Sequence, residues 1–588
     1  KENFVLAWRR VSTGTNVYYK RFFRNVFLAY EVALEENIAN LIDRIKGKSY
    51  LPREPEKVFL PKASGLQRPV TLLSVEDQIV YQAIANIIAD KWHSRRHPFE
   101  YQTVFSNIPN KNSIFFFDNY KISYSRFKQK TAECFEAGYK WVAHFDLAAF
   151  YDTISHDLIK RMVHNAHSSS ELSDLTSQLL KAWTSRLRTG LLSHGVPQGP
   201  LASSLIGEIT LFDIDKEMSG DQNSLVYLRY VDDIRVMAKE EDAVRLGLVK
   251  LEQLCRMKGL IPQSSKTSIF CAGTPEEAIG KSISFTSEEF EPILDKNYLQ
   301  SCLSEDKSKI ENFSRFKYFL FRSNPSAEFV KTMLHLFSTY PDLCDGFQIH
   351  LENYRRSKTV INFLVNMLIT RRLPYQYYEG VVWLILAKVD PERSSYTKLQ
   401  DIATDRLLSN SANQLSFNLR FGLYSYLFPY VESLPKKVIN RYFYEPSSIL
   451  QSLIIIESKT YLSSSNYHAL MRRCFTRTLP DAGLVAGMKL ALDSEKLTDL
   501  DQISLKYPVK TLLAKMGVLT AVEVKRAHPF EELMERRYDV KCGYWSELIG
   551  TEYNHAHNLL VFSESSYNSN PSAWLCNIDN LNEIITHS

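Results

Sequence analysis

Two adjacent aspartates lie between two short strand-like runs, and this pair limits what the chain can fold into more than any other feature. Residues 225–237 read Leu-Val-Tyr-Leu-Arg-Tyr-Val-Asp-Asp-Ile-Arg-Val-Met, with β-branched and aromatic residues on both sides of Asp232 and Asp233. This pattern predicts a hairpin that carries two carboxylates at its tip. Neighbouring anions disfavour each other's ionisation, so this pair would destabilise the fold on its own. A bound divalent cation would remove that repulsion, which favours a metal-binding role for the pair.

A third carboxylate follows another strand-like run upstream. Residues 141–146 read Trp-Val-Ala-His-Phe-Asp, and Ser155 and Asp157 then suit the cap and first turn of a helix. Asp146 is therefore expected at the end of a strand. Beside the hairpin pair it would complete a set of oxygen ligands for two Mg²⁺ ions, which lie roughly 3.5–4 Å apart in phosphoryl-transfer sites. One ion would activate a primer hydroxyl and the other would hold the triphosphate.

Both carboxylate segments resemble, in order and spacing, the two catalytic palm motifs of reverse transcriptases. The segments are residues 145–152, Phe-Asp-Leu-Ala-Ala-Phe-Tyr-Asp, and residues 229–233, Arg-Tyr-Val-Asp-Asp. The resemblance covers about residues 38–290. Taken alone, an Asp-Asp pair is more often a β-turn, but its combination with the other motifs favours a polymerase site.

Up to about residue 290, helical patterns alternate with short strand-like runs and turn signals, which predicts an α+β fold. The resemblance implies that this is a right-hand polymerase, with fingers and palm in residues 1–290. It also implies which groups hold the two Mg²⁺ ions, with Mn²⁺ as a substitute. These are the carboxylates of Asp146, Asp232 and Asp233 and the backbone carbonyl of Leu147.

A glycine loop lies between the two carboxylate motifs and resembles a third signature of the family. Residues 195–204 read Gly-Val-Pro-Gln-Gly-Pro-Leu-Ala-Ser-Ser, and Gln198 and Gly199 carry the match. Gly199 permits close approach of the backbone to a nucleotide. A helix is expected to begin at about Leu201.

Two cations flank a Ser-Gly turn near the N-terminus. Lys62 and Arg68 would stand on neighbouring strands of one hairpin, where both could reach a triphosphate. The alternative is a pair of solvated surface cations. Resemblance to the fingers hairpin of the family favours a nucleotide-binding role.

Two further positions take their roles from the resemblance. Lys266, in Lys-Gly-Leu-Ile-Pro-Gln-Ser-Ser-Lys, matches the lysine near the leaving pyrophosphate and is a candidate general acid. Tyr151, five residues after Asp146, matches an aromatic placed against the sugar and is interpreted as a steric gate for deoxynucleotides. The alternatives are a solvated lysine and a core aromatic.

Basic and aromatic residues mix in two places, although the net charge of only +5 identifies no partner. Arg9, Arg10, Lys20 and their neighbours could bind an anion or could form a solvated helix face. Residues 115–130 interleave aromatics with cations, as single-strand binding surfaces do, and could equally be a half-buried helix.

Beyond about residue 290 the strand signal fades and helical spacing continues. Residues 291–588 are therefore predicted to form an all-α domain, joined to the first through a linker near 287–295. The clearest helices are expected at Ser357–Thr370, Tyr375–Lys388, Ser447–Glu457 and Ala482–Leu492. They could stack as a solenoid or form a compact bundle, since no repeated motif is present. His555 and His557 read as solvated rather than metal-binding.

The second half shows no metal-binding cysteine pattern of an intron endonuclease, no carboxylate set of an RNase H domain and no retron signature. A palm followed by some 300 helical residues resembles the bacterial abortive-infection and defence-associated reverse transcriptases. That resemblance implies antiphage defence and DNA synthesis from dNTPs, either untemplated or templated by a noncoding RNA. It also implies priming from a protein hydroxyl in some members, and homo-oligomers or complexes with another defence protein. Scattered cysteines predict a reducing cytosol, and the apolar runs are too short to span a membrane. The resemblance implies that this cytosol is bacterial.

Two other functions stay open. One is a templated reverse transcriptase of group II intron or mobile-element type, in which the helical half replaces the thumb. The other is a non-catalytic RNA-binding scaffold that signals through the helical half. Three crowded acids argue against a scaffold, because perturbed acids mark functional sites.

Overall fold

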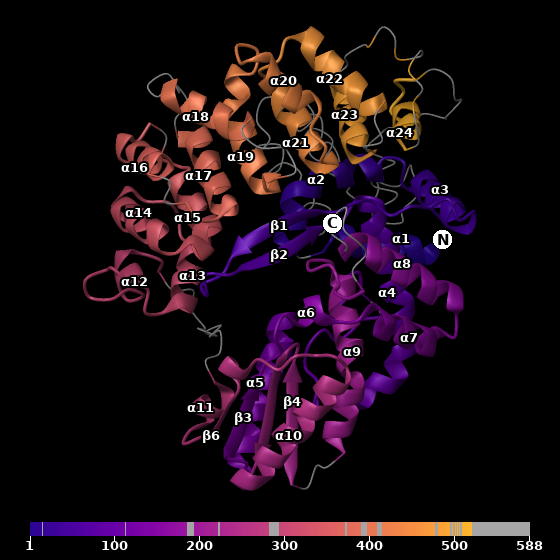
Figure 1. The fold of residues 1–588 in the computed structure, drawn as a ribbon, viewed down its shortest axis with the longest axis vertical. Coiled ribbons are helices and arrows are strands. Elements are labelled where there is room, and N and C mark those ends of the chain that lie inside the picture. The colour runs from indigo at the N-terminus through magenta and orange to yellow at the C-terminus, as the bar shows by residue number, and fades with distance from the viewer. Residues whose placement is uncertain are drawn as a thin grey trace, which may run out of the picture. The chain divides into compact units, whose positions relative to one another are not determined.

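The computed structural model describes residues 1–519 except 15, 112, 185–192, 221–223, 281–292, 355, 371–372, 390–396, 409–413, 477–479 and scattered positions between 494 and 507. The chain forms two compact units. Figure 1 labels helices and strands of both units. The first comprises Lys1–Lys20 and Tyr50–Leu427, and the second comprises Arg21–Ser49 and the chain from Phe428. A domain boundary near residue 290 stays a proposal, which rests on the change from mixed to helical structure.

The described strands all lie in the first unit. They are β1 (Glu56–Pro61), β2 (Gln67–Leu72), β3 (Trp141–Phe145), β4 (Leu225–Tyr230), β5 (Asp233–Ala238) and β6 (Ser268–Cys271). Helices of this unit before residue 281 are α1 (Glu2–Ser12), α4 (Val75–Arg96), α5 (Tyr120–Glu136), α6 (Phe150–Thr153), α7 (His156–His167), α8 (Ser170–Thr184), α9 (Leu201–Ser219), α10 (Glu241–Met257) and α11 (Pro275–Ile279). Helix α2 (Val17–Glu31) contributes residues to both units.

The described chain after residue 292 is helical. In the first unit it forms α12 (Lys296–Gln300), α13 (Phe313–Arg322), α14 (Val330–Thr339), α15 (Cys344–Leu351), α16 (Lys358–Ile369), α17 (Gln376–Val389), α18 (Thr397–Leu408) and α19 (Phe417–Leu427). The second unit holds α3 (Leu34–Lys46), α20 (Lys436–Phe443), α21 (Ser448–Ser458), α22 (Ser464–Thr476), α23 (Pro480–Leu492) and α24 (Val509–Lys515). The four helices predicted most clearly are confirmed as α16, α17, α21 and α23.

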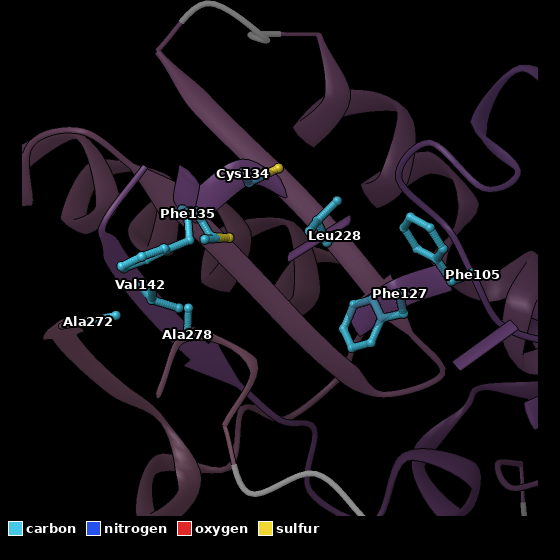
Figure 2. Packing of buried hydrophobic residues seen from close by; sticks show 9 residues of the cluster. Phe105, Phe127, Cys134, Phe135, Val142, Leu228, Ala272 and Ala278 are labelled. Carbon is cyan, nitrogen blue, oxygen red and sulfur yellow. The ribbon is translucent and has the colours of Figure 1, made fainter. Parts of the chain in front are cut away.

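Four antiparallel strands form the palm sheet, in the order β4-β5-β3-β6. One face of this sheet is covered by α5 and α11. Figure 2 shows the core between them, in which Val142 and Leu228 project from the sheet toward Phe127 and Phe135 of α5. Alternation along the strands sends the neighbouring residues to the opposite face.

The opposite face of the palm sheet packs on α9 and α10. Leu225 and Val236 project toward α10, where a Cβ added to Gly247 would meet a Leu225 methyl at 2.7 Å. Tyr227 and Arg229, at alternate positions of β4, both reach Asp215 of α9. Because both faces are covered, most residues of β4 and β5 are buried, and these include the charged Arg229 and Arg235.

The fingers hairpin is a separate two-stranded ribbon, β1-β2, with Leu60 opposite Arg68 and Pro61 opposite Gln67. It packs on the helical part of the first unit, where β1 touches α17 and α19 (Figure 1). Glu56 at the start of β1 lies 3.4 Å from Arg420 of α19, and the hydroxyl of Tyr375 donates to the carbonyl of Gly65 at the hairpin turn. The hairpin is therefore held at both ends.

Helices α17 and α19 pack with unusually close backbones. A Cβ at Gly380 would meet the carbonyl oxygen of Asn418, and one at Gly422 would meet that of Gly380. Larger residues at these two positions would force the helices apart. Helix α15 also contacts α17, as α17 contacts α19. The solenoid stays a prediction, because this pairing also fits a bundle.

Within the part of the chain that the structure describes, no helix combines the length and apolar character needed to cross a bilayer.

Candidate functional site

The structure brings the three predicted carboxylates to one edge of the palm sheet. Strands β3 and β5 are antiparallel with Phe145 opposite Ile234, so the next pair outward is Asp146 opposite Asp233. On the other side of β5, Tyr230 pairs with Asp233, which leaves Val231 and Asp232 as the two turn residues. Asp146 and the hairpin pair therefore meet where β3 ends and β5 begins.

Lys266 joins this group directly. Its ammonium donates to Oδ2 of Asp146 at 2.6 Å, from a side chain that is 67% exposed. The backbone holds this lysine in place, because the amide of Gln263, at the start of the same turn, donates to the carbonyl of Asp146. The sequence predicted Lys266 near the leaving group, and the structure places it on a predicted metal ligand.

The electrostatics of the group fit a divalent cation. Burial, and then the nearby carboxylates of Asp146 and Asp233, raise the pKa of Asp232 above its ordinary value. A cation bound beside Asp232 would favour the ionised form of this carboxyl. The carbonyl of Leu147 adds an oxygen, since the pairing with residues 261–263 uses the groups of its neighbours Asp146 and Ala148. The residues present thus fit Mg²⁺.

The loop that carries Gln198 and Gly199 connects fingers to palm. The amide of Thr71, at the end of β2, donates to the carbonyl of Gln198 at 2.7 Å. The hydroxyl of Tyr19 donates to the carbonyl of Thr71 at 2.7 Å. On the palm side, the side-chain amide of Gln198 donates from Nε2 to the Asp152 carboxylate, at 3.3 and 3.4 Å. A nucleotide bound beside this loop would therefore contact both subdomains.

A side chain at residue 199 would be strained and crowded. The Gly199 φ of +129° lies where L-residues are strained, and an added Cβ would lie 3.2 Å from the carbonyl oxygen of Thr71 and 3.3 Å from the Tyr19 ring. We expect Gly199→Ala to displace the loop and to raise the KM for dNTP by about tenfold, the effect of roughly 1.4 kcal/mol of lost binding. Steady-state kinetics with each dNTP measure this.

The matched control is Gly220→Ala, at the far end of α9. Gly220 has ordinary helical backbone, and its added Cβ would approach other atoms no closer than 3.8 Å. An equal rise in KM in both variants would contradict a specific role for Gly199.

The ring of Tyr151 is fixed beside the carboxylates. It packs on Phe150 with ring centroids 5.1 Å apart, and a Cβ at Gly207 would lie 3.2 Å from its Cε1 atom. Burial, and then Glu208, raise the pKa of Tyr151 above its ordinary value, and Asp232 adds to this effect. The phenol is thus partly buried near Asp232, and its role as a gate stays a prediction.

The predicted triphosphate cations lie on the fingers hairpin. Arg68 is on β2, whereas Lys62 follows the last residue of β1, and its amide donates to the carbonyl of Leu66 across the turn. Both side chains are exposed. They are available to an anion, and their contact with a nucleotide stays a prediction.

Two other interpretations require correction. Arg10 is no surface cation, because it is buried and donates to Asn86 Oδ1 at 2.7 Å. Ser155 occupies the cap position of α7 without a side-chain cap bond.

In residues 115–130, α5 begins at Tyr120 and is half-buried, while Phe115, Tyr120 and Ile122 stay exposed. His555 and His557 lie outside the described residues.

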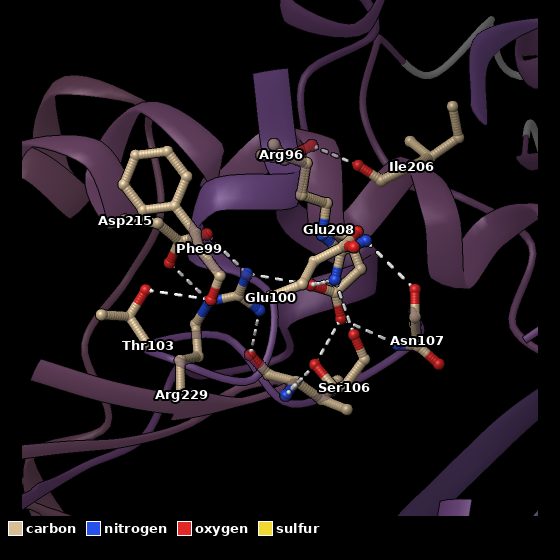
Figure 3. Close-up of polar contacts among 12 residues, drawn as sticks. Arg96, Phe99, Glu100, Thr103, Ser106, Asn107, Ile206, Glu208, Asp215 and Arg229 are labelled. Atoms are coloured by element: carbon tan, nitrogen blue, oxygen red, sulfur yellow. Dashed lines mark hydrogen bonds and ion pairs between the residues drawn. The ribbon is translucent and has the colours of Figure 1, made fainter. Parts of the chain in front are cut away.

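A buried ionic network beneath the hairpin was not predicted (Figure 3). Arg229 donates two hydrogen bonds to the Asp215 carboxylate, at 2.7 and 2.6 Å, and lies 2.9 Å from Glu208. Arg96 lies 3.2 Å from Glu208, whose other oxygen accepts from Ser106 at 2.6 Å. The sequence offered one indication of this network. Glu208 and Asp215 are seven residues apart on the apolar helix α9, and this spacing places them on one face.

The charges of this network stabilise one another. Burial opposes the charge of Arg229, but Asp215 and Glu208 raise its pKa well above the ordinary value. Burial alone would raise the pKa of Glu208, yet Arg229 and Arg96 hold it below the ordinary value. The charged forms of Arg229 and Glu208 therefore stabilise each other, whereas burial raises the pKa of Asp215 despite the nearby guanidinium of Arg229. Removal of one partner would leave another buried charge unpaired.

The segment that holds these motifs matches a known protein family. Residues 60–311 match the family described as "Reverse transcriptase (RNA-dependent DNA polymerase)". This segment contains both palm motifs, the Gln198-Gly199 loop and Lys266. Residues 60–311 therefore carry the reverse-transcriptase fold, and the enzyme class of that domain is RNA-directed DNA polymerase, a nucleotidyltransferase.

Individual relatives are distant and partial. Protein YkfC of Escherichia coli (strain K12) is 27% identical over 179 residues, which are 30% of this chain and 44% of that protein. The group II intron-encoded protein LtrA of Lactococcus lactis subsp. cremoris is 22% identical over 239 residues, 40% of this chain and 37% of that protein. The chain thus spans less than half the length of these curated relatives.

Solved structures of telomerase also align. Telomerase from Candida albicans, in complex with a TWJ fragment of telomeric RNA, aligns at a TM-score of 0.29 and 11% identity, covering 59% of this chain and 64% of that one. Apo telomerase from Candida tropicalis aligns at a TM-score of 0.30 and 11% identity, covering 67% of this chain and 74% of that one.

Proposed function

We propose that this protein synthesises DNA by metal-assisted nucleotidyl transfer at the edge of the palm sheet. The observation that carries the proposal is the register of β3 against β5, which sets Asp146 opposite Asp233 beside the Asp232 turn. Burial and the nearby carboxylates of Asp146 and Asp233 raise the pKa of Asp232, so a bound cation would stabilise its ionised form.

Each residue of the site has a place in this chemistry. Asp146, Asp232, Asp233 and the Leu147 carbonyl would hold two Mg²⁺ ions, which supply charge neutralisation at the transferred phosphate. Lys266, whose ammonium donates a hydrogen bond to Asp146, would shift toward a leaving pyrophosphate and donate a proton. Gln198 and Gly199 would position the nucleotide from the palm side, and Lys62 and Arg68 would bind its triphosphate from the fingers side.

The proposed setting is bacterial antiphage defence, and the support for it is the helical chain that follows the palm. The first unit continues from α12 to α19 and packs on the fingers hairpin. Such a region could replace a thumb and contact a noncoding RNA, a DNA product, a second copy or another defence protein. The partial match to LtrA supports the rival proposal, a templated enzyme of intron or mobile-element type.

One incubation series tests these proposals. Purified protein, with and without its co-purified RNA, receives each dNTP singly and then all four with Mg²⁺, and the product is sequenced. Homopolymer from a single dNTP without RNA supports untemplated synthesis, whereas product that copies the RNA supports the templated rival. Absence of product from the wild type under every condition would favour a non-catalytic scaffold.

The same products report on priming. If a protein hydroxyl is the primer, labelled DNA should stay with the polypeptide through denaturation and leave it on protease digestion. Complete release by denaturant alone would contradict protein priming.

Sugar selection offers a test of Tyr151. Its ring packs between Phe150 and Gly207, and these contacts would keep the ring from moving aside to admit a ribose 2′-hydroxyl. We expect Tyr151→Ala to raise the ratio of ribonucleotide to deoxynucleotide incorporation by about 10–100-fold, the range that one steric contact supplies. Competition assays with paired dNTP and rNTP measure the ratio. Tyr151→Phe keeps the ring and should keep the selectivity; unchanged sugar choice in Tyr151→Ala would exclude a gate.

A further inference from the structure

The turn that carries Asp232 is strained. Val231 has φ of +58°, in the left-handed region that favours glycine. A β-branched residue is especially unfavourable there, because its branched Cβ crowds the backbone. Such strain persists only where the surroundings hold the backbone in place.

Hydrogen bonds from two directions hold the peptide groups of Val231. Its amide donates to the hydroxyl of Ser106 at 2.7 Å, and its carbonyl accepts from Nη1 of Arg229 at 3.0 Å. The next residue along the chain is Asp232. Fixing both peptide groups of Val231 therefore fixes the direction in which the Asp232 backbone leaves the turn.

Both supporting groups are themselves fixed by Glu208. The Ser106 hydroxyl donates to Oε1 of Glu208 at 2.6 Å, so its lone pair is turned toward the Val231 amide. Arg229 contacts Oε2 of the same carboxylate at 2.9 Å and is fully buried. Glu208 thus orients two groups that reach the catalytic turn from different elements.

From this connectivity we infer that Ser106, Glu208 and Arg229 are positioning residues, which hold Val231 in its strained conformation so that the Asp232 carboxylate faces Asp146. The inference rests on the proposed polymerase function. It assigns the buried network a role in metal binding at the surface of the sheet, in addition to its role in stability. Ser106 is the member to test, because its removal leaves all the buried charges in place.

The experiment compares Ser106→Ala, Ser106→Thr and the double variant Ser106→Ala/Val231→Gly. Ser106→Ala should lower kcat on the order of 10–100-fold, the cost of a misplacement of about 1 Å, with little change in the KM for dNTP. It should also weaken Mn²⁺ binding, measured by electron paramagnetic resonance without substrate. Threonine keeps the hydroxyl and should restore both. Glycine adopts the left-handed conformation without strain and should restore much of the loss.

The control is Tyr227→Phe. It removes the hydrogen bond of 2.8 Å to Asp215 within the same network, without a contact to Val231. Equal losses of kcat and Mn²⁺ affinity in Ser106→Ala and Tyr227→Phe would overturn the inference, as would failure of Val231→Gly to relieve the loss. If the wild type incorporates no dNTP, the proposed function fails, while the Mn²⁺ titrations still decide whether Ser106 positions Asp232.

Discussion

Asp232→Asn should reduce dNTP incorporation by at least about 10³-fold. A metal-held charge at the transferred phosphate is worth several kcal/mol, and each 1.36 kcal/mol is a factor of ten in rate. The substituted asparagine would keep the shape of the side chain and lose the anionic oxygen that completes the set with Asp146 and Asp233. Primer-extension rates over a range of Mg²⁺ concentrations measure the loss, which saturating Mg²⁺ should not restore.

The same substitution should stabilise the protein when no metal is present. Because the pKa of Asp232 is raised in the folded state, the folded protein binds this proton more tightly than the unfolded chain. The contribution of this carboxyl to the free energy of unfolding is fully present below its unfolded pKa of about 3.9. It is lost as pH rises through the folded pKa. Asp232→Asn avoids that loss. In metal-free buffer its thermal midpoint should exceed that of the wild type at pH 8, with a smaller difference at pH 4.

Asp213→Asn is the matched control for both measurements. Asp213 lies on α9 of the same unit, is 67% exposed and pairs with Lys258 at 2.7 Å. Its replacement should leave incorporation unchanged, and exposed pairs contribute about 0–1 kcal/mol to stability. Incorporation by Asp232→Asn at the wild-type rate would refute the carboxylate site. No incorporation by either protein would favour the scaffold.

Local sequence patterns predicted the strands and turns that carry the site. Alternating β-branched and aromatic residues around Asp232 specify a hairpin because the pattern repeats with the period of a strand. The Pro-Gln-Gly-Pro turn before Leu201 correctly marked the start of α9. The reverse-transcriptase resemblance then supplied what local patterns lack, which is that Asp146 and Asp233 lie on adjacent strands.

Contacts between distant residues were not predictable in this way. Ser106 lies in a loop between α4 and α5, and only the folded chain shows that its hydroxyl joins Glu208 to Val231. The strain at Val231 was equally hidden, since valine is among the least expected residues at positive φ. Lys266 was identified, but its ion pair with Asp146 depends on the turn at Gln263.

Arg229→Leu should destabilise the first unit by about 3–5 kcal/mol, the cost of leaving a buried charge without its partner. Arg229 is fully buried, and it is the cation that contacts both oxygens of Asp215. In the variant, Asp215 would keep the Tyr227 hydroxyl as a donor but would lose the guanidinium that balances its charge. Thermal unfolding followed by circular dichroism measures the change. Lys258→Met, which removes the partner of the exposed Asp213 carboxylate, should cost far less, because that carboxylate stays in contact with water.

The destabilisation by Arg229→Leu should grow with pH. Burial already raises the pKa of Asp215 in the wild type, and loss of the guanidinium removes the largest opposing effect. The folded variant would then hold the proton well above the unfolded pKa of about 3.9, so its stability falls as pH rises from that value to the new folded pKa. Midpoints measured at pH 5 and pH 8 should therefore diverge from the wild type most at pH 8.

A second substitution tests whether the unpaired carboxylate is the cause. Arg229→Leu/Asp215→Asn carries no charge at residue 215, while an asparagine oxygen still accepts from Tyr227. The double variant should recover more stability at pH 8 than at pH 5, because the cost of a raised folded pKa at residue 215 grows as pH rises above the unfolded pKa. Equal recovery at both pH values would instead assign the loss to the volume and packing of Arg229, since a packing defect does not titrate.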